Sequence, residues 1–172
     1  MKEADLQPTL RGSLIELRPL RLDDYDALFQ AASDPLIWAQ HPENDRYQPE
    51  VFRKFFELAM ASKGALVVID LQSGRIIGSS RYWDYSPERS DVEIGWTFLE
   101  RAFWGGQYNR ELKSLMLNHA FGFVDRVLFV VGETNLRSQK ALEKIGARLI
   151  RTAVVPSARG LNPNKLVFAI DR

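Results

Sequence analysis

The sequence has no cysteine, almost no excess of charge and no long apolar run, and each absence excludes a class of protein. Without cysteine, the 172-residue chain has no disulfide, thiolate metal ligand or cysteine nucleophile, which is typical of a cytoplasmic protein. Its 23 basic and 22 acidic residues give a net charge of +1, without the basic footprint of a nucleic-acid-binding protein. No apolar stretch approaches the ~18 residues of a membrane span, and Met1–Leu6 is too polar for a signal peptide. We therefore expect a cytoplasmic protein that binds neither nucleic acid nor membrane.

Histidine is also scarce. His41 and His119 are the only two histidines, and no carboxylates cluster beside them in the sequence, so no metal site is predicted. The chain also has no Gly-x-Ser-x-Gly elbow and no Walker-type phosphate loop, which argues against a hydrolase or a nucleotidase.

The residues that are present predict one mixed α/β domain over residues 1–172, with a loose segment at 1–12. Hydrophobic residues make up 45% of the chain and charged residues 26%, as in ordinary globular proteins. Periodicity and turn residues predict a strand, two helices, a three-stranded meander, a helix, a strand, a helix and two strands. The first strand is expected at Leu14–Arg18, and the two helices begin at Asp23 and Pro49.

The stretch around which the rest is expected to be organised is a strand, a glycine turn and a long helix. Apolar and other residues alternate over Asp91–Leu99, Gly105 and Gly106 follow, and apolar residues then recur at helical spacing over Asn109–Val124. The first N–H groups of a helix have no partner inside it, and the helix dipole adds partial positive charge there. This arrangement predicts a site for a phosphate-bearing cofactor.

The second half of the chain predicts a buried strand at Val127–Val131 and a short helix ended by Gly146. Two closing strands follow, around a loop at Pro156–Asn164. Asn135 or Thr134 is expected to cap the short helix.

Two short motifs mark these two helices, in the same order along the chain. One lies at the glycine turn and the other at the start and end of the short helix. The residues that carry them are Trp104, Gly105, Tyr108 and Glu111, then Asn135, Ser138, Glu143, Lys144 and Gly146.

Together these motifs resemble the GCN5-related N-acetyltransferase (GNAT) superfamily, and more narrowly its Rim-type ribosomal-protein N-acetyltransferase branch. The resemblance covers residues 13–171 by element order. It implies a single-domain fold with a mixed, mostly antiparallel twisted sheet, flanked by about four helices, whose central strands splay apart. The chain departs from the family pattern at Gln107 and Asn109, where two small residues are usual, and at Ala147, where an aromatic residue is common.

The resemblance implies acetyl-CoA as the cofactor. Its pantetheine arm would lie against the backbone of the Asp91–Leu99 strand, and its diphosphate would lie on the amides of the Gly105–Gly106 turn. The start of the short helix that ends at Gly146 would also contact the cofactor. Arg101 is available for charge near the turn. The expected cofactor-binding residues are Trp96, Thr97, Phe98, Trp104, Gly105, Gly106, Gln107, Tyr108, Asn109, Arg110, Asn135 and Ser138.

For catalysis we expect Glu93 to be the base and Ser138 to donate a hydrogen bond to the leaving sulfur. Glu93 alternates with the apolar residues of its strand and so faces the other side. The alternatives are a solvated carboxylate or ion-pair partner for Glu93 and a cap or packing residue for Ser138. Many family members carry a tyrosine acid where this chain has Leu142.

The acceptor is expected to be a primary amine, such as a protein N-terminus, and the enzyme a homodimer. One alternative is a small-molecule amine: an amino acid, a polyamine or an aminoglycoside. Another is a non-catalytic acyl-CoA-binding module, suggested by Gln107, Asn109 and the missing tyrosine. The aromatic loop is either core or one wall of the acceptor pocket. Residues expected to contact the acceptor are Trp38, His41, Tyr82, Trp83 and Asp84.

Overall fold

A computed structural model describes residues 3–154 and 164–172, which form one eight-stranded sheet in the order β1-β2-β3-β4-β5-β6-β8-β7. All neighbouring strands are antiparallel except β5 and β6, which are parallel. The strands are β1 (Leu10–Arg11), β2 (Ile15–Pro19), β3 (Ala65–Asp70), β4 (Ile76–Ser86), β5 (Asp91–Leu99), β6 (Arg126–Gly132), β7 (Arg148–Val154) and β8 (Asn164–Asp171). The helices are α1 (Tyr25–Ala32), α2 (Pro49–Ser62), α3 (Gln107–Ala120) and α4 (Leu136–Lys144), with short 3-10 turns at Leu22–Asp24, Pro35–Ile37 and Arg101–Phe103.

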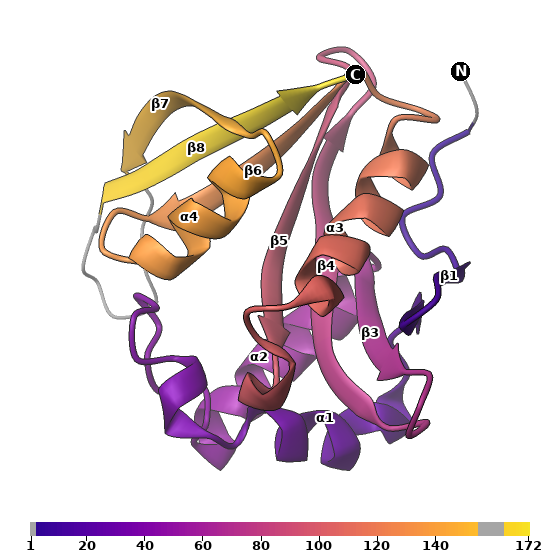
Figure 1. Cartoon of the computed structure of the whole chain (residues 1–172), viewed down its shortest axis with the longest axis vertical. Coiled ribbons are helices and arrows are strands. Elements are labelled where there is room, and N and C mark those ends of the chain that lie inside the picture. The colour runs from indigo at the N-terminus through magenta and orange to yellow at the C-terminus, as the bar shows by residue number, and fades with distance from the viewer. Residues whose placement is uncertain (1–2, 155–163) are drawn as a thin grey trace.

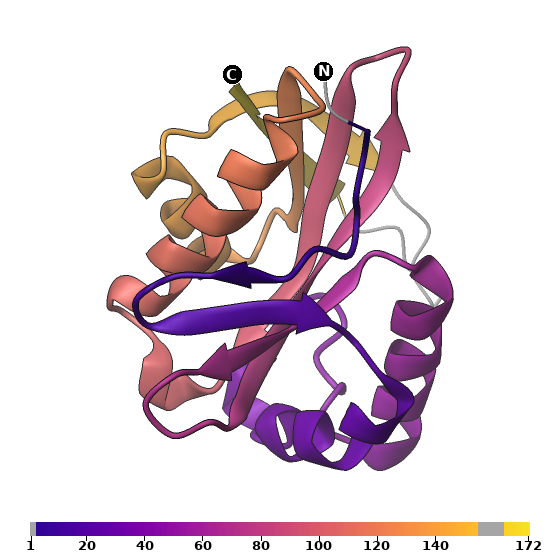
Figure 2. The same cartoon turned by 90° about the vertical axis from the view of Figure 1, so that its right-hand side faces the viewer.

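Helices cover both faces of the sheet. Helices α3 and α4 lie on one face, and α1 and α2 lie on the other (Figures 1 and 2). One core cluster lies beneath α3 and α4, with Leu112, Met116 and Phe129 among its members. A second, aromatic-rich cluster joins α1 and α2 to the sheet and includes Phe52 and Phe56. The mixed sheet with helices on both faces confirms the fold expected from the sequence.

The order of elements also agrees with the sequence analysis, with two corrections. The segment 1–12 is not all loose, because Leu10–Arg11 pairs with β2. Helix α3 ends at Ala120 rather than at Val124, because a turn containing Gly122, a poor helix former, follows it. The expected loop at Pro156–Asn164 falls on residues 155–163, outside the described part of the chain, apart from Asn164, which begins β8.

The two central strands part along their length. Strands β5 and β6 are paired only at Asp91–Arg126, Val92–Val127 and Glu93–Leu128. Beyond this point β5 stays with β4 and β6 stays with β8. Figure 1 shows the two strands together at one end and apart at the other. The expected splayed strands are therefore present, and the backbone groups that face the gap are left without a neighbouring strand.

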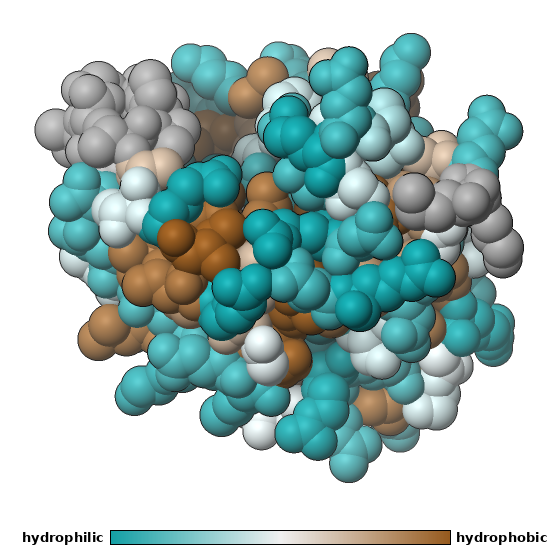
Figure 3. All heavy atoms as spheres, turned by 90° about the horizontal axis from the view of Figure 1, so that it is seen from above, coloured by the Kyte–Doolittle hydropathy of each residue, from teal (hydrophilic) through white to brown (hydrophobic). Residues whose placement is uncertain are grey.

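The surface is of an ordinary kind. In the view from above, hydrophilic side chains surround smaller hydrophobic areas (Figure 3). Large apolar side chains that are exposed, such as Leu22, Leu58 and Leu136, come from different elements, as is normal for a folded chain. Among the described residues, no helix has the length and apolar character needed to cross a membrane.

Glu111 of α3 joins that helix to the first strands. Its carboxylate accepts hydrogen bonds from the backbone N–H groups of Ser13, Leu14 and Ile15 at 2.8–3.0 Å and from the Ser13 hydroxyl at 2.7 Å. Burial raises the pKa of Glu111, but these hydrogen bonds outweigh it and hold the pKa below its ordinary value. The glutamate of the first motif thus has a structural role in this chain.

We predict that Glu111→Ala lowers the free energy of unfolding by about 2 kcal/mol at pH 7, because the N–H groups of the β1–β2 turn and of Ile15 lose their acceptor. Since the folded-state pKa is depressed, this contribution is present above the unfolded pKa of about 4.3 and disappears as the pH falls through the folded value. Urea unfolding at pH 7 and at pH 3 measures both effects. Glu57→Ala, at an exposed position on α2, is the control. A loss of stability at pH 3 as large as at pH 7 would contradict the role of the charge.

Candidate functional site

The site is built around an irregularity in β5. On β4, one residue separates Ser79 from Arg81, whereas two separate their partners Phe98 and Gly95 on β5. The extra residue makes a β-bulge at Trp96, whose φ of 52° lies in the left-handed region. That conformation is strained for a bulky residue, and such strain is found mainly where function requires it. The bulge turns β5 away from regular pairing next to the point where β6 leaves it.

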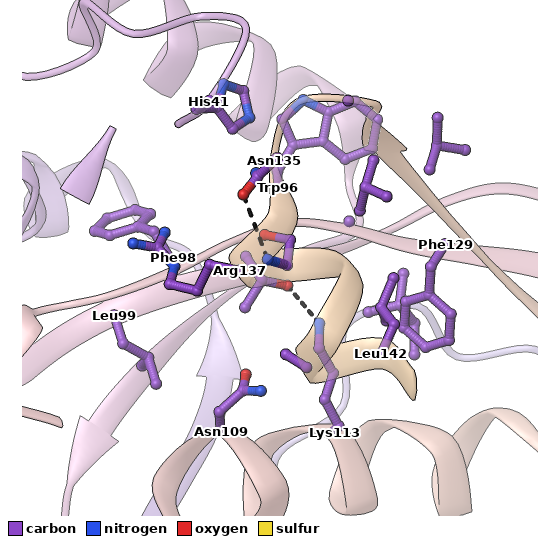
Figure 4. A pocket seen from close by; sticks show the side chains of 18 of the residues that line it. His41, Trp96, Phe98, Leu99, Asn109, Lys113, Phe129, Asn135, Arg137 and Leu142 are labelled. Atoms are coloured by element: carbon purple, nitrogen blue, oxygen red, sulfur yellow. Dashed lines mark hydrogen bonds between the residues drawn. The ribbon is translucent and has the colours of Figure 1, made fainter. Parts of the chain in front are cut away.

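A cavity of about 220 Å³ lies where the two strands have parted. One wall is β5 from Ile94 to Leu99, and the opposite wall is β6 from Phe129 to Gly132. Residues of α3 and α4 also line it, and Figure 4 shows their side chains pointing into the same space. The cavity is therefore a slot between two strands, with two helices beside it.

The N-terminus of α3 opens beside this slot. No side chain caps the helix, so its first N–H groups remain available to an anion. Gly105 has a φ of 72°, and a Cβ atom placed on Gly105 or Gly106 would meet no heavy atom within 4 Å among the described residues. The turn is open at the point where the sequence predicted a diphosphate.

The residues predicted for the cofactor divide into two groups. Trp96, Thr97 and Phe98 line the cavity, as do residues of the turn and of α4. Gly106, Gln107, Tyr108 and Arg110 do not line it: Gln107 and Arg110 are exposed, and the Tyr108 hydroxyl donates a hydrogen bond to Asp70 Oδ1 at 3.1 Å. Arg101 is ion-paired with Asp34. The remaining predicted residues that line the cavity are Trp104, Gly105, Asn109, Asn135 and Ser138.

Helix α4 presents its first turn to the cavity. Asn135 is its cap, since its side chain accepts the backbone N–H of Ser138 at 3.4 Å (Figure 4), and Thr134 does not cap it. Both Asn135 and Ser138 line the cavity, so the cap role and a ligand role are compatible. Leu142 lies one turn further along and is apolar, so this position supplies no acid.

Glu93 is partly buried on β5, and its carboxylate lies against Gly95, a cavity residue. Burial raises its pKa to about 7, with the negative charge of Asp84 adding to the rise and the positive charges of Lys165 and Arg81 opposing it. Near neutral pH this carboxylate is therefore divided between its protonated and ionised forms. That is the property required of a general base that works at pH 7.

Comparison with known proteins identifies the family. The profile of the acetyltransferase (GNAT) domain matches residues 15–148, which is more than half of the chain. The chain belongs to the GNAT acetyltransferases. It is thus an N-acetyltransferase by family, and the family uses acetyl-CoA. None of the curated proteins searched matches the chain.

Solved structures agree with this fold. A GCN5-related N-acetyltransferase from Brucella melitensis has 21% identity and a TM-score of 0.83 over 96% of this chain and 79% of its own. A GNAT acetyltransferase from Bacillus anthracis has 21% identity and a TM-score of 0.77 over 95% and 98%. RimJ from Mycobacterium smegmatis, in complex with CoA-disulfide, has 18% identity and a TM-score of 0.72 over 95% and 86%. The resemblance to Rim-type proteins is thus one of fold.

Two residues predicted for the acceptor lie elsewhere in this GNAT enzyme. Tyr82 is fully buried, and its hydroxyl donates to the Met116 carbonyl oxygen at 2.7 Å beneath α3. Trp38 is 3% exposed, and its indole N–H donates to the Ala32 carbonyl oxygen at 2.9 Å. Both side chains belong to the core. The aromatic loop was expected to be either core or a wall of the acceptor pocket, and Trp38 is part of the core.

The other acceptor candidates remain near the site or at the surface. His41 lines the cavity (Figure 4), and burial, with the nearby charges of Arg46 and Lys165, lowers its pKa to about 3, so it is neutral. Trp83 is partly exposed and packs edge-on against Trp96, with ring centroids 5.9 Å apart. Asp84 is exposed at the surface and forms an ion pair with Arg89 at 3.1 Å.

Three cations lie on the His41 side of the site, one buried and two partly buried, and the sequence pattern did not indicate them. Arg81 is 5% exposed and stacks over Trp96, with 4.4 Å from its guanidinium carbon to the ring centroid. Arg46 Nη1 lies 3.4 Å from His41 Nε2. Burial lowers the pKa of Arg46 and of Arg81 to about 10, and it also lowers the pKa of Lys165, a cavity residue. Carboxylates lie among these cations: Glu43 and Asp45 act on Arg46, and Glu93 acts on Arg81 and Lys165.

Lys113 and Arg137 also line the cavity and were missed. Arg137 stacks over Trp104 at 3.7 Å and donates to the Ile37 carbonyl oxygen. Lys113 directly follows Leu112 of the buried stripe, and a lysine in that position is usually taken as the polar edge of the helix. Within the described residues, no cluster of histidines and carboxylates has the form of a metal site.

The two glycines of the turn predict different effects on stability. Gly105→Ala places a side chain at a φ of 72° and should cost roughly 1–2 kcal/mol of stability. Gly106 has a φ of −125°, which any residue adopts, and a Cβ atom at this position meets open space. The free energy of unfolding of Gly106→Ala should therefore stay within about 0.5 kcal/mol of the unchanged protein. Urea unfolding of the two variants tests this. Equal losses of stability in the two variants would show that the turn in solution does not have the backbone angles described here.

Proposed function

We propose that this protein transfers an acetyl group from acetyl-CoA to a primary amine in a ternary complex, and that a protein N-terminal α-amine is one such acceptor. The observation that carries the proposal is the slot between β5 and β6, which opens next to the uncapped N-terminus of α3. A slot between unpaired strand edges suits an amide-rich arm, because such an arm can pair with backbone groups as an added strand does. An uncapped helix end suits the diphosphate attached to that arm.

The residues present fit this cofactor. The backbone of β5 at Trp96, Thr97 and Phe98 would hold the pantetheine arm, and the amides from Trp104 to Asn109 would hold the diphosphate. The open space at Gly106 leaves room for the close approach of phosphate oxygens, although Gln107 stands where a small residue is usual. When bound, acetyl-CoA supplies an acetyl thioester, which a neutral amine can attack.

Protein groups then handle the protons. Glu93 accepts a proton from the incoming amine, directly or through a water, since its pKa of about 7 leaves it partly ionised at neutral pH. An α-amine with a pKa near ~8 is partly neutral at this pH, whereas a lysine near ~10.4 is almost wholly charged. Ser138 and the N-terminal end of α4 favour the departing sulfur by hydrogen bonding and by the helix dipole. Leu142 removes the tyrosine route in this chain.

The charges near the site narrow the acceptor class. A polyamine or an aminoglycoside needs several carboxylates that do not already face a cation. On this side Glu43, Asp45 and Glu93 lie among Arg46, Arg81 and Lys165 and already act on those cations. Like charges that face one another in a partly buried site are unfavourable. We therefore place polycations below peptide α-amines and amino acids as acceptors. The non-catalytic alternative is disfavoured by the match to the acetyltransferase domain over residues 15–148.

The first test is binding and turnover. Calorimetry with acetyl-CoA should give saturable binding, and Gly106→Ala should weaken it at least about tenfold because its Cβ takes the room of the diphosphate. Release of free CoA is then measured with free-amine peptides, the same peptides N-blocked, amino acids, spermidine and an aminoglycoside. Absence of binding at millimolar acetyl-CoA would remove the proposal. Binding without CoA release across the panel would favour the non-catalytic module.

The second test concerns the base. Glu93→Gln should lower kcat by about 10²-fold or more and leave the Kd of acetyl-CoA within about threefold. In the unchanged protein, kcat/KM should rise with pH through about 7 as Glu93 loses its proton and again near ~8 as the substrate amine does. In the variant only the rise near ~8 should remain. Glu88→Gln, at an exposed position in the β4–β5 turn, is the matched control. An unchanged pH profile would show that another group is the base.

A further inference from the structure

Lys113 is a lysine in an unusual place. It lies on α3 with its side chain directed into the slot between the parted strands (Figure 4), and it is only 7% exposed. Lysine is almost never buried to this extent unless its charge is paired. An apolar residue in this position would continue the buried face formed by Leu112 and Met116. The cavity therefore contains a polar group that the packing of the helix does not require.

The contacts of the lysine leave part of its hydrogen-bonding capacity unused. Its Nζ donates to Thr97 Oγ1 at 2.7 Å, and that oxygen also lies 2.8 Å from Ser80 Oγ. Nζ lies 5.4 Å from the centroid of the Phe129 ring across the slot. An ammonium has three donors, and within the described residues Thr97 is its one hydrogen-bond partner. The remaining donors are therefore free for a ligand in the cavity that Lys113 lines.

No carboxylate balances this group. Among the described residues Lys113 forms no ion pair, and burial alone lowers its pKa to about 7. The ionisable groups that line the same cavity are His41, Arg137 and Lys165, none of which carries negative charge. Glu93 lies on β5, and its charge does not contribute to the shift at Lys113. A ligand group that accepts a hydrogen bond is therefore what this site lacks.

We propose that Lys113 is a cofactor-positioning residue whose Nζ donates a hydrogen bond to a carbonyl oxygen of the acyl-pantetheine arm, within the slot between β5 and β6. This rests on the proposed use of acetyl-CoA. The arm is rich in amide and thioester carbonyls, which are the acceptors that an ammonium in a narrow, partly apolar slot requires. Thr97 holds Nζ on the β5 side, so that its remaining donors point at the arm.

Binding should then be linked to proton uptake. A carbonyl that accepts a hydrogen bond favours the charged ammonium and raises the pKa of Lys113 in the complex. At pH 8 the free protein has Lys113 mostly neutral, given a pKa of about 7, so binding draws in a proton. At pH 6 the lysine is already protonated and binding draws in little. His41 stays neutral in both states, whereas Glu93 titrates in the same range and must be controlled.

Three variants separate the hydrogen bond from the charge. Lys113→Met removes both, Lys113→Gln keeps a donor without charge, and Lys140→Met, at an exposed position on α4, is the matched lysine control. Calorimetry with acetyl-CoA in two phosphate-free buffers of different ionisation enthalpy at each pH, MES and Bis-Tris at pH 6 and HEPES and Tris at pH 8, gives the Kd and the number of protons taken up. Glu93→Gln and Glu93→Gln/Lys113→Met, measured in the same way, isolate the contribution of the lysine.

We expect Lys113→Met to weaken acetyl-CoA about 10- to 100-fold at pH 6 and to abolish the extra proton uptake at pH 8. Lys113→Gln should recover part of the affinity without the proton uptake, and Lys140→Met should match the unchanged protein. Thermal unfolding should show Lys113→Met to be at least as stable, because a buried amine is replaced by an apolar chain of similar length.

The outcomes distinguish this inference from the proposed function. If the unchanged protein binds acetyl-CoA and Lys113→Met has the same Kd and proton uptake while remaining folded, the role of Lys113 is wrong and the proposed function stands. If Lys113→Met loses affinity only in proportion to a loss of thermal stability, the lysine is structural and the inference is also overturned. If the unchanged protein does not bind acetyl-CoA, both fail together.

Discussion

The parting of β5 and β6 after Glu93 and Leu128 is the constraint on which the rest of this structure depends. Two parallel strands that separate leave backbone groups without partners, and such groups must be satisfied by water or by a ligand. The bulge at Trp96 turns β5 aside, while β8 keeps β6 in place from its other edge. Helices α3 and α4 then pack on the same face beside the opening, each with its N-terminal turn toward the slot. A cofactor with an anionic end and an amide-rich arm matches the two kinds of unsatisfied group that this arrangement creates.

Three residues near this opening have an energetically unfavourable backbone angle or an unfavourably buried polar group. Trp96 adopts a left-handed φ, Lys113 is buried without a counter-charge, and Arg81 has a buried Nε with no hydrogen-bond partner. Elsewhere the described core is conventional, with apolar residues filling both faces of the sheet. Where sequence and packing agree in most of a fold but conflict in one region, the conflict usually marks function. In this chain the three conflicts surround a single cavity and its acceptor side, which ties them to the acetyltransferase chemistry of the family.

Most of the fold could be predicted because it follows from local patterns. The alternation over Asp91–Leu99, the apolar run at Val127–Val131 and the helical spacing after Gly106 each define one element, and the two motifs fix their order. The site was predicted less completely, because alternation says that two residues share a face without saying which face is which. Tyr82 was placed with the acceptor, but it points beneath α3 to Met116. Lys113 was missed because Leu112, its neighbour, already accounts for the apolar face of α3, so the lysine is expected at the polar edge of that face. Only the tertiary packing shows that α4, β5 and β6 enclose this edge.

The titration of the site has one physical origin. Burial disfavours whichever form of a side chain is charged, so it raises the pKa of Glu93 and lowers that of Lys113, each to about 7. At neutral pH, before any ligand enters, each group is therefore divided between its neutral and its charged form, which lowers the cost of unpaired charge. A carbonyl beside Lys113 and an ammonium beside Glu93 act in opposite directions, the first drawing a proton onto the lysine and the second drawing one off the carboxylic acid. On the proposed roles, loading the arm and presenting the amine would shift both groups toward their charged forms, which would prepare the carboxylate as a base at the stage when its substrate is present.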